Sequence, residues 1–299
     1  MRFGFWPGPN SSWNDTIALC KHAEATGWDG IWYADHFMPN EADPVGPTNE
    51  SWTFIAAIAA EVPRVRIGHL VNGNTYRFPA VTAKMAAGVD QISGGRFILG
   101  LGGGWQENEH EAYGIPFYDM PERLRRLDEA CQIVAGLFSN EKTTFEGRYY
   151  QIADAPLNPK PVQSPLPIMI GGGGEKVTLK ITAKYAHEWN VWGDPDTLQQ
   201  KMAILDKHCA DQGRDPAEIQ RSAAAMLFLS DDPDVVERAG GIGRPVIAGN
   251  VEQVKEIVQR YIDIGVDEII IPDFNLGRTA ADKMEAADRF MNDVGSTFR

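Results

Sequence analysis

The chain has 299 residues, of which 43% are hydrophobic and 23% charged, so it is long enough to bury a sizeable core. Its formal net charge of −13 argues against a nucleic-acid-binding surface. No apolar run reaches the about 18 residues that a membrane span needs, and Pro7 and Pro9 interrupt the N-terminus too early for a secretory signal. We therefore expect a cytoplasmic globular protein that binds neither nucleic acid nor membrane.

Short apolar runs alternate with helical patterns along the whole chain. Helix boundaries are indicated by Asn14 and Asp15 with Gly27 as the stop, by Ser51, and by Pro79. Apolar strands joined by long helices are typical of a parallel sheet whose two faces are both covered. The predicted strands cover residues 2–6, 30–34, 65–71, 96–102, 167–172, 188–193, 222–230 and 268–272.

These strand–helix units predict a (β/α)8 barrel, or TIM barrel, as a single domain over residues 1–299. The alternative is a doubly wound open sheet, whose usual marker is a G-x-G-x-x-G turn after the first strand. The segment "GFWPGPN" lacks that turn. Residues 140–166 contain four prolines and interrupt the alternation between the fourth and fifth strands. We interpret them as an insertion on the barrel rather than a domain boundary.

Asp35 and His36 directly follow the second predicted strand, at the end where a barrel collects its chemistry. In isolation, an Asp that caps a loop beside a hydrogen-bonded His explains the pair equally well, and it is the position that favours function. Metal binding through His and carboxylate is the next alternative, but no H-x-H or H-E-x-x-H spacing is present. The cluster from Glu107 to Glu111 is interpreted as a solvated or rim-facing helix start. We therefore predict no metal site.

Glycine clusters end the fourth and fifth predicted strands. They read "LGLGGGW" over residues 99–105 and "IGGGGEK" over residues 170–176. The second cluster also opens a predicted helix, and unobstructed backbone amides at the positive end of a helix bind anions, so we infer a phosphate site there. Neither cluster matches the P-loop or the dinucleotide pattern, and close packing of strand and helix is the alternative use of these glycines.

Taken together, these stretches resemble the bacterial luciferase-like superfamily, and within it the branch of oxidoreductases that use the deazaflavin coenzyme F420. The resemblance covers essentially the full length and rests on "FGFW" and on residues 27–39, 67–115 and 167–193. It implies a (β/α)8 barrel with an insertion, hydride transfer to or from F420, and a homodimer. Two alternatives stay open, namely an FMN-dependent monooxygenase of the same superfamily and a non-catalytic flavin-binding protein.

The resemblance also implies roles for particular residues. His36 would be the catalytic proton-relaying residue, and Asp35 would be a second catalytic residue in contact with the ring. The end of the third strand would lie behind the ring, with a non-prolyl cis peptide bond between Leu70 and Val71. The implied cofactor-binding residues are Asp35, His36, Leu70, Val71, Asn72, Gly103, Gly104, Asn108, Gly172, Gly173, Gly174 and Lys176.

The chain departs from the sugar-phosphate dehydrogenases of this branch. Trp105 stands where those relatives carry an acidic residue, and Asn40 stands where they carry a Trp. Of the basic residues that hold the sugar phosphate in them, Arg278 is the one candidate counterpart, so a sugar-phosphate substrate is not expected. Tryptophans at the strand ends instead predict an aromatic-lined pocket for a small neutral or apolar substrate. The predicted pocket residues are Trp6, Asn40, Trp105 and Trp192, with Trp189 as a further wall candidate.

Overall fold

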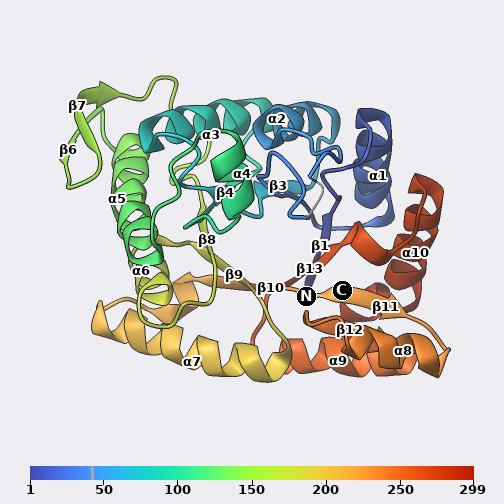
Figure 1. Ribbon diagram of the computed structural model, residues 1–299. Helices are drawn as coiled ribbons and strands as arrows, with labels where there is room; N and C mark the ends of the chain where they lie inside the picture. Colours follow the sequence, from blue (N-terminus) through green and yellow to red (C-terminus); the bar gives the residue numbers. More distant parts are fainter. Residues whose placement is uncertain (42–43) are drawn as a thin grey trace.

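The computed structural model describes residues 1–41 and 44–299, and within them eight parallel strands close into a barrel (Figure 1). The ring is closed by pairing of β3 with β5, at Ile67 with Phe97. The predicted (β/α)8 fold is therefore confirmed. The barrel strands are β1 (Arg2–Trp6), β2 (Gly30–Tyr33), β3 (Arg66–His69), β5 (Phe97–Gly102), β8 (Ile168–Gly171), β9 (Glu188–Trp192), β10 (Gln220–Ala224) and β13 (Glu268–Pro272), and β4 (Asn72–Gly73) continues β3 along β5.

Helices cover the outside of the barrel, and side-chain caps fix where they begin (Figure 1). The hydroxyl of Ser12 accepts a hydrogen bond from the Asp15 amide, so the first helix begins before the predicted Asn14 and ends at Gly27 with φ 96°. In the described part of the chain, no helix has the length and apolar character to cross a membrane. The helices are α1 (Trp13–Thr26), α2 (Ser51–Glu61), α3 (Pro79–Ser93), α4 (Glu107–Ala112), α5 (Met120–Ser139), α6 (Thr178–Tyr185), α7 (Pro195–Asp211), α8 (Pro233–Gly240), α9 (Val251–Asp263) and α10 (Ala280–Asp293), with 3-10 turns at Pro216–Glu218, Asp273–Asn275 and Gly295–Phe298.

In the described part of the chain, two segments form strands outside the barrel, and one of them was predicted as an insertion. Residues 140–166 contain the antiparallel hairpin of β6 (Lys142–Glu146) and β7 (Gln151–Pro156), so the insertion between the fourth and fifth barrel strands is confirmed. In Figure 1 this hairpin projects beyond α5 at the edge of the molecule.

The second departure corrects the predicted strand 222–230. The Ala225 amide still donates to Ile270 in β13, but the Met226 amide donates to Pro245 instead. The chain therefore leaves the barrel here, and β11 (Met226–Leu229) pairs with β12 (Val246–Gly249) in a separate parallel sheet. Residues 223–229 are all apolar, so hydrophobicity gave no sign of the exchange of partners.

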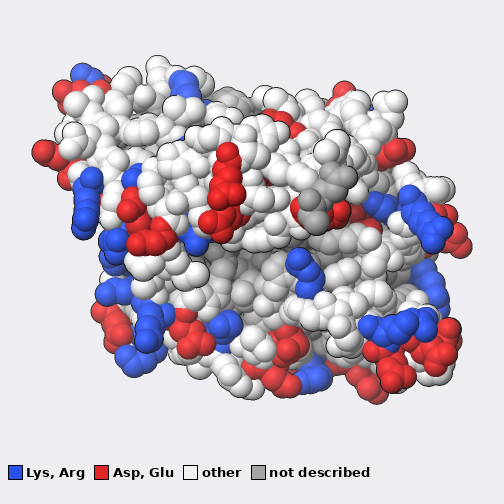
Figure 2. All heavy atoms as spheres, in the orientation of Figure 1, with Lys and Arg blue, Asp and Glu red and all other residues white. Residues whose placement is uncertain are grey.

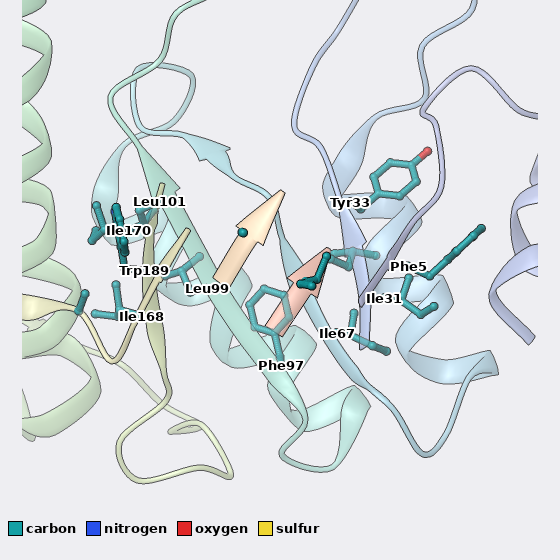
Figure 3. Packing of buried hydrophobic residues seen from close by; sticks show 14 of the residues in the cluster. Phe5, Ile31, Tyr33, Ile67, Phe97, Leu99, Leu101, Ile168, Ile170 and Trp189 are labelled. Carbon is teal, nitrogen blue, oxygen red and sulfur yellow. The ribbon is translucent and has the colours of Figure 1, made fainter. Parts of the chain in front are cut away.

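Alternate residues of each strand face two different cores. The outward set packs against the helices, and Figure 3 shows part of it, including Phe97, Leu99 and Leu101 of β5. The inward set forms a smaller cluster inside the barrel, as is usual for this fold. It consists of Trp6, Trp32, Ala34, Leu70, Ile98, Met169, Ala224 and Ile270.

Trp32 fills the amino-terminal end of the barrel. Its ring lies where a Cβ on Gly4 or on Gly68 would come within 2.6 or 2.5 Å, so these two glycines make the room for it. Its Nε1 donates to Glu268 at 2.8 Å, and Arg66 pairs with Glu268 at 2.6 Å. Arg66 also pairs with Glu188. This end is closed by packing and by paired charges, so the open end is the one at which the strands terminate.

Candidate active site

The carboxyl-terminal strand ends surround a cavity of about 1660 Å³. Figure 2 shows this face of the molecule hollowed between its upper and lower parts, with positive and negative side chains interspersed around the hollow. Most of the predicted site residues line the cavity, whereas Asn72, Asn108 and Lys176 do not. Those that line it are Trp6, Asp35, His36, Asn40, Leu70, Val71, Gly103, Gly104, Trp105, Gly172, Gly173, Gly174 and Trp192.

His36 is held at the cavity wall by a buried carboxylate. Its Nδ1 lies 2.8 Å from Oε1 of Glu109, whose other oxygen accepts from the Phe37 amide at 2.7 Å. The Tyr76 hydroxyl donates to the same carboxylate. Since a carboxylate only accepts, Nδ1 carries the proton, and Nε2 is left without a partner among the described residues. The ring also meets Trp105 edge-on at 5.5 Å.

Glu109 is ionised in this arrangement. Burial acts to raise the pKa of Glu109, but the hydrogen bonds from His36, from the Phe37 amide and from Tyr76 hold that pKa below its ordinary value. Burial and the adjacent Glu109 raise the pKa of Tyr76, which stays a phenol that donates. The carboxylate therefore fixes both the orientation and the tautomer of the imidazole.

The prediction that residues 107–111 form a solvated or rim-facing cluster is wrong for its centre. Glu109 and His110 are fully buried. His110 donates from Nδ1 to the Gln106 carbonyl at 2.6 Å and accepts at Nε2 from the Thr75 hydroxyl at 2.7 Å. The helical spacing could have revealed that Glu109 is buried. Glu107 and Glu111 are four residues apart and lie on the same exposed face of the helix, so Glu109 lies on the opposite face.

The Asp35 carboxylate accepts its hydrogen bonds from other residues of the protein. Its two oxygens accept from Arg77 at 2.7 and 3.1 Å, and the Gly73 amide donates to it at 3.1 Å. Arg77 also pairs with Glu50 at 2.9 Å. Burial raises the pKa of the Asp35 carboxyl, against the opposing effect of Arg77. Asp35 thus anchors the segment after β3, while Nε2 of its neighbour His36 has no partner in the described part of the chain.

The segment after β3 directs Val71 into the mouth of the barrel. The peptide bond between Leu70 and Val71 is cis, as the resemblance implied. A Cβ on Gly102 would lie 2.6 Å from the Val71 side chain, and one on Gly171 would lie 2.8 Å from it. These glycines therefore leave space for Val71, which forms a raised apolar floor in the cavity. Asn72 lies behind this floor, where its side chain accepts from Trp52 and Arg77.

The fifth-strand glycine cluster differs from the prediction in one respect. The helix that follows begins at Thr178, not at the cluster, and the Gly172 amide donates to the Asn190 carbonyl at 2.9 Å. The amides of Gly173 and Gly174 have no partner among the residues that the structure describes. Lys176 is exposed, whereas Lys201, which the sequence reasoning missed, donates to the Gly173 carbonyl at 2.9 Å.

Aromatic side chains at the ends of β1, β9 and β13 also line the cavity. The Trp6 ring lies 5.7 Å from that of Trp192 and 5.2 Å from that of Phe274. The guanidinium of Arg244, which follows α8, lies 4.9 Å from the centre of the Trp192 ring. Trp189, in contrast, is fully buried in the outer core, so its suggested place in the wall is wrong.

The chain belongs to the luciferase-like monooxygenase family, whose model matches residues 1–250. It is 40% identical over 220 residues to an F420-dependent glucose-6-phosphate dehydrogenase of Kineococcus radiotolerans. That match covers 71% of this chain and 63% of the relative, so the chain spans less than two thirds of the relative's length. A protein of the same name from Intrasporangium calvum is 34% identical over 308 residues, covering 88% of this chain and 89% of that one.

A solved structure supports the fold. An F420-dependent secondary alcohol dehydrogenase, in complex with an F420-acetone adduct, superposes with a TM-score of 0.86 at 20% identity. The match covers 100% of this chain and 99% of that chain. The predicted resemblance to the luciferase-like family is confirmed by the family model, and this structure agrees with it in fold.

Proposed function

We propose that this protein is an oxidoreductase that transfers a hydride between coenzyme F420 and a small neutral or apolar organic substrate. The observation that carries the proposal is the His36 imidazole, which Glu109 holds through Nδ1 at the wall of a large cavity. The names of the two sequence relatives, both F420-dependent dehydrogenases, support the choice of coenzyme. The match covers only 63% of the first relative, so the proposed substrate and activity are argued from the geometry of the site and not from that relative's name.

The residues of the cavity fit a deazaflavin. Val71 and the glycines beside it form a smooth apolar floor against which a flat ring system can lie. The unpartnered amides of Gly173 and Gly174, in the described region, offer donors to a phosphate at one edge. A cavity of about 1660 Å³ exceeds the usual size of a small-molecule site and so has room for coenzyme and substrate together.

When bound, F420 supplies the hydride acceptor or donor, and the remaining tasks fall to the side chains. His36 Nε2 releases or takes up the one proton that accompanies the hydride, while the Glu109 carboxylate stabilises the imidazolium form. Asp35 positions the ring-supporting segment through Arg77 and the Gly73 amide, and we assign it this positioning role in place of direct proton transfer. Trp6 and Trp192 form an apolar wall that helps to exclude water from the cavity.

The charges of the lining support a neutral substrate. The cations that line the cavity are Arg123, Arg244, Arg278 and Lys283, and the anions are Asp15, Asp35, Glu41 and Asp273. A sugar-phosphate site would need a clear excess of cations, which this lining does not have.

Titration of the purified protein with F420, and separately with FMN, tests the coenzyme assignment. We expect F420 to bind with the higher affinity and a screen of ketones, enones and secondary alcohols then to reveal turnover with F420. Preference for FMN would instead indicate an FMN-dependent monooxygenase. Binding of F420 without turnover of any substrate would favour a non-catalytic flavin-binding protein. The predicted single domain, homodimer and cytoplasmic location stay predictions.

A further inference from the structure

A second polar group at the mouth has no task in hydride transfer. Asp273, directly after β13, is fully buried, and its Oδ2 pairs with Lys283 Nζ of α10 at 2.9 Å. Its Oδ1 accepts from the Gly8 amide at 2.9 Å. Both Asp273 and Lys283 line the cavity, and the Lys283 side chain is only 12% exposed. Burying an ion pair is costly, and its position at the cavity gives it a use beyond packing.

Among the residues that the structure describes, Lys283 has hydrogen-bond donors without a partner on this side of the mouth. An ammonium group has three N–H donors, and Lys283 uses one of them within the described part of the chain. Trp6 is 7% exposed, and its Nε1 is buried without any partner among the described residues. Trp6 belongs to the same side, since its ring contacts Phe274, which adjoins Asp273. Buried donors are normally satisfied, so the N–H groups that Lys283 leaves over beside the cavity indicate an acceptor supplied by a ligand. The Nε1 of Trp6 is not accessible from the cavity, so Trp6 contributes its ring.

The pair also selects the charge of that acceptor. Because Asp273 neutralises Lys283, the two together present donors with no net positive charge. An anionic group would meet the Asp273 carboxylate as well as the ammonium. An uncharged oxygen, such as that of a carbonyl, hydroxyl or ether, accepts from Lys283 without this repulsion. The aromatic rings of Trp6 and Phe274 cover the hydrocarbon part that bears such an oxygen.

We propose that Lys283, supported by Asp273 and Trp6, binds an uncharged oxygen of the substrate distal to the carbon that reacts near His36. The inference rests on the proposed function, because it names a feature of the substrate of that same site. It restricts the substrate class to neutral molecules with two oxygen-bearing positions joined by an apolar segment. Lys283 is then a specificity-determining residue, and its contribution is separate from that of His36.

Isothermal titration calorimetry with matched ligands tests this assignment. A series of linear ketones is compared with diketones of the same chain length, so that the second oxygen is the one difference within each pair. The titrations use the full chain, both free and loaded with F420. We expect one diketone or more to bind about tenfold more tightly than the matching ketone, and we expect Lys283→Met to abolish this preference.

Two further variants keep the test decisive. Lys283→Met leaves Asp273 unpaired, so the double variant Asp273→Asn with Lys283→Met removes both charges, and thermal unfolding shows which of them folds. Lys184→Met, which removes a Lys–Asp pair with Asp128 away from the cavity lining, is the matched control and should keep the preference.

The outcomes separate the two proposals. Equal affinity for ketone and diketone at every length, absence of binding by both, or a preference that survives Lys283→Met would each overturn the assignment of Lys283. Failure of F420 to bind would instead overturn the proposed function. In that case the ketone series on the free protein still decides whether Lys283 recognises the second oxygen.

Discussion

Glycines in the barrel strands make room at both ends of the barrel, but the room is used in opposite ways. At the amino end, Trp32 fills the space that Gly4 and Gly68 leave, and Arg66 joins Glu268 beneath it. At the carboxyl end, glycines again make room, but the cavity above them is left open. The difference teaches that stability and chemistry reside at opposite ends of one fold, so substitutions at each end should affect different measurements.

His36→Ala is the strongest test at the open end. Loss of the proton-transferring imidazole should lower kcat by about 10²–10⁴-fold with whichever substrate is turned over. The affinity for F420 and the midpoint of thermal unfolding should stay close to those of the wild type. Steady-state kinetics and a coenzyme titration measure the two effects separately, and unchanged turnover would remove His36 from the mechanism.

Trp32→Ala is the strongest test at the closed end. The variant leaves a cavity inside the barrel and removes the hydrogen bond to Glu268, so the free energy of unfolding should fall by about 3–5 kcal/mol. Urea denaturation measures this loss. Trp32→Phe, which keeps a ring, should lose less. If the folded fraction of Trp32→Ala lost its affinity for F420 in proportion to its stability, the two ends would not be separable.

Glu109→Gln sharpens the comparison, because Glu109 serves both stability and chemistry. The hydrogen bonds that it accepts should contribute about 1–3 kcal/mol to the free energy of unfolding at neutral pH. The pKa of Glu109 is lowered from 4.5 on folding, so this contribution is fully present above pH 4.5 and is lost as the pH falls through the lowered value. Urea midpoints across acidic pH should show the wild type and variant converging. A difference that grows on acidification would contradict the ionised assignment.

The barrel itself followed from the sequence, because buried parallel strands and helix caps are local signals. The prediction of one strand over residues 222–230 was wrong at Met226, where the backbone changes its hydrogen-bond partner. Such a change cannot be recognised from a sequence that stays apolar on both sides of it. The hairpin insertion was located by its prolines, which cannot continue a parallel strand.

The site was predictable where a residue's place at a strand end decides its exposure. His36, Gly103 and Trp105 reach the cavity for that reason. Glu109 was missed because its importance comes from its burial and from three donors that converge on it, namely His36 and the Phe37 amide after β2 and Tyr76 after β4. Lys201 was missed because the carbonyl it contacts lies 28 residues away in sequence. Convergence of this kind depends on packing between elements, which periodicity does not report.

A pair of glycine substitutions gives the smallest and most direct comparison. A Cβ on Gly102 would lie 2.6 Å from Val71, whereas one on Gly88, on the exposed side of α3, would meet nothing within 4 Å. Gly102→Ala should push Val71 towards the ring site and weaken F420 binding by about tenfold, with a loss of unfolding free energy of about 1 kcal/mol. Gly88→Ala should leave binding unchanged and raise the unfolding free energy by about 0.5–1 kcal/mol. Coenzyme titration and urea denaturation of both variants decide the matter. Unaltered F420 affinity in Gly102→Ala would show that Val71 is not the floor on which the ring lies, because the same added methyl group at Gly88 controls for the chemistry of the substitution.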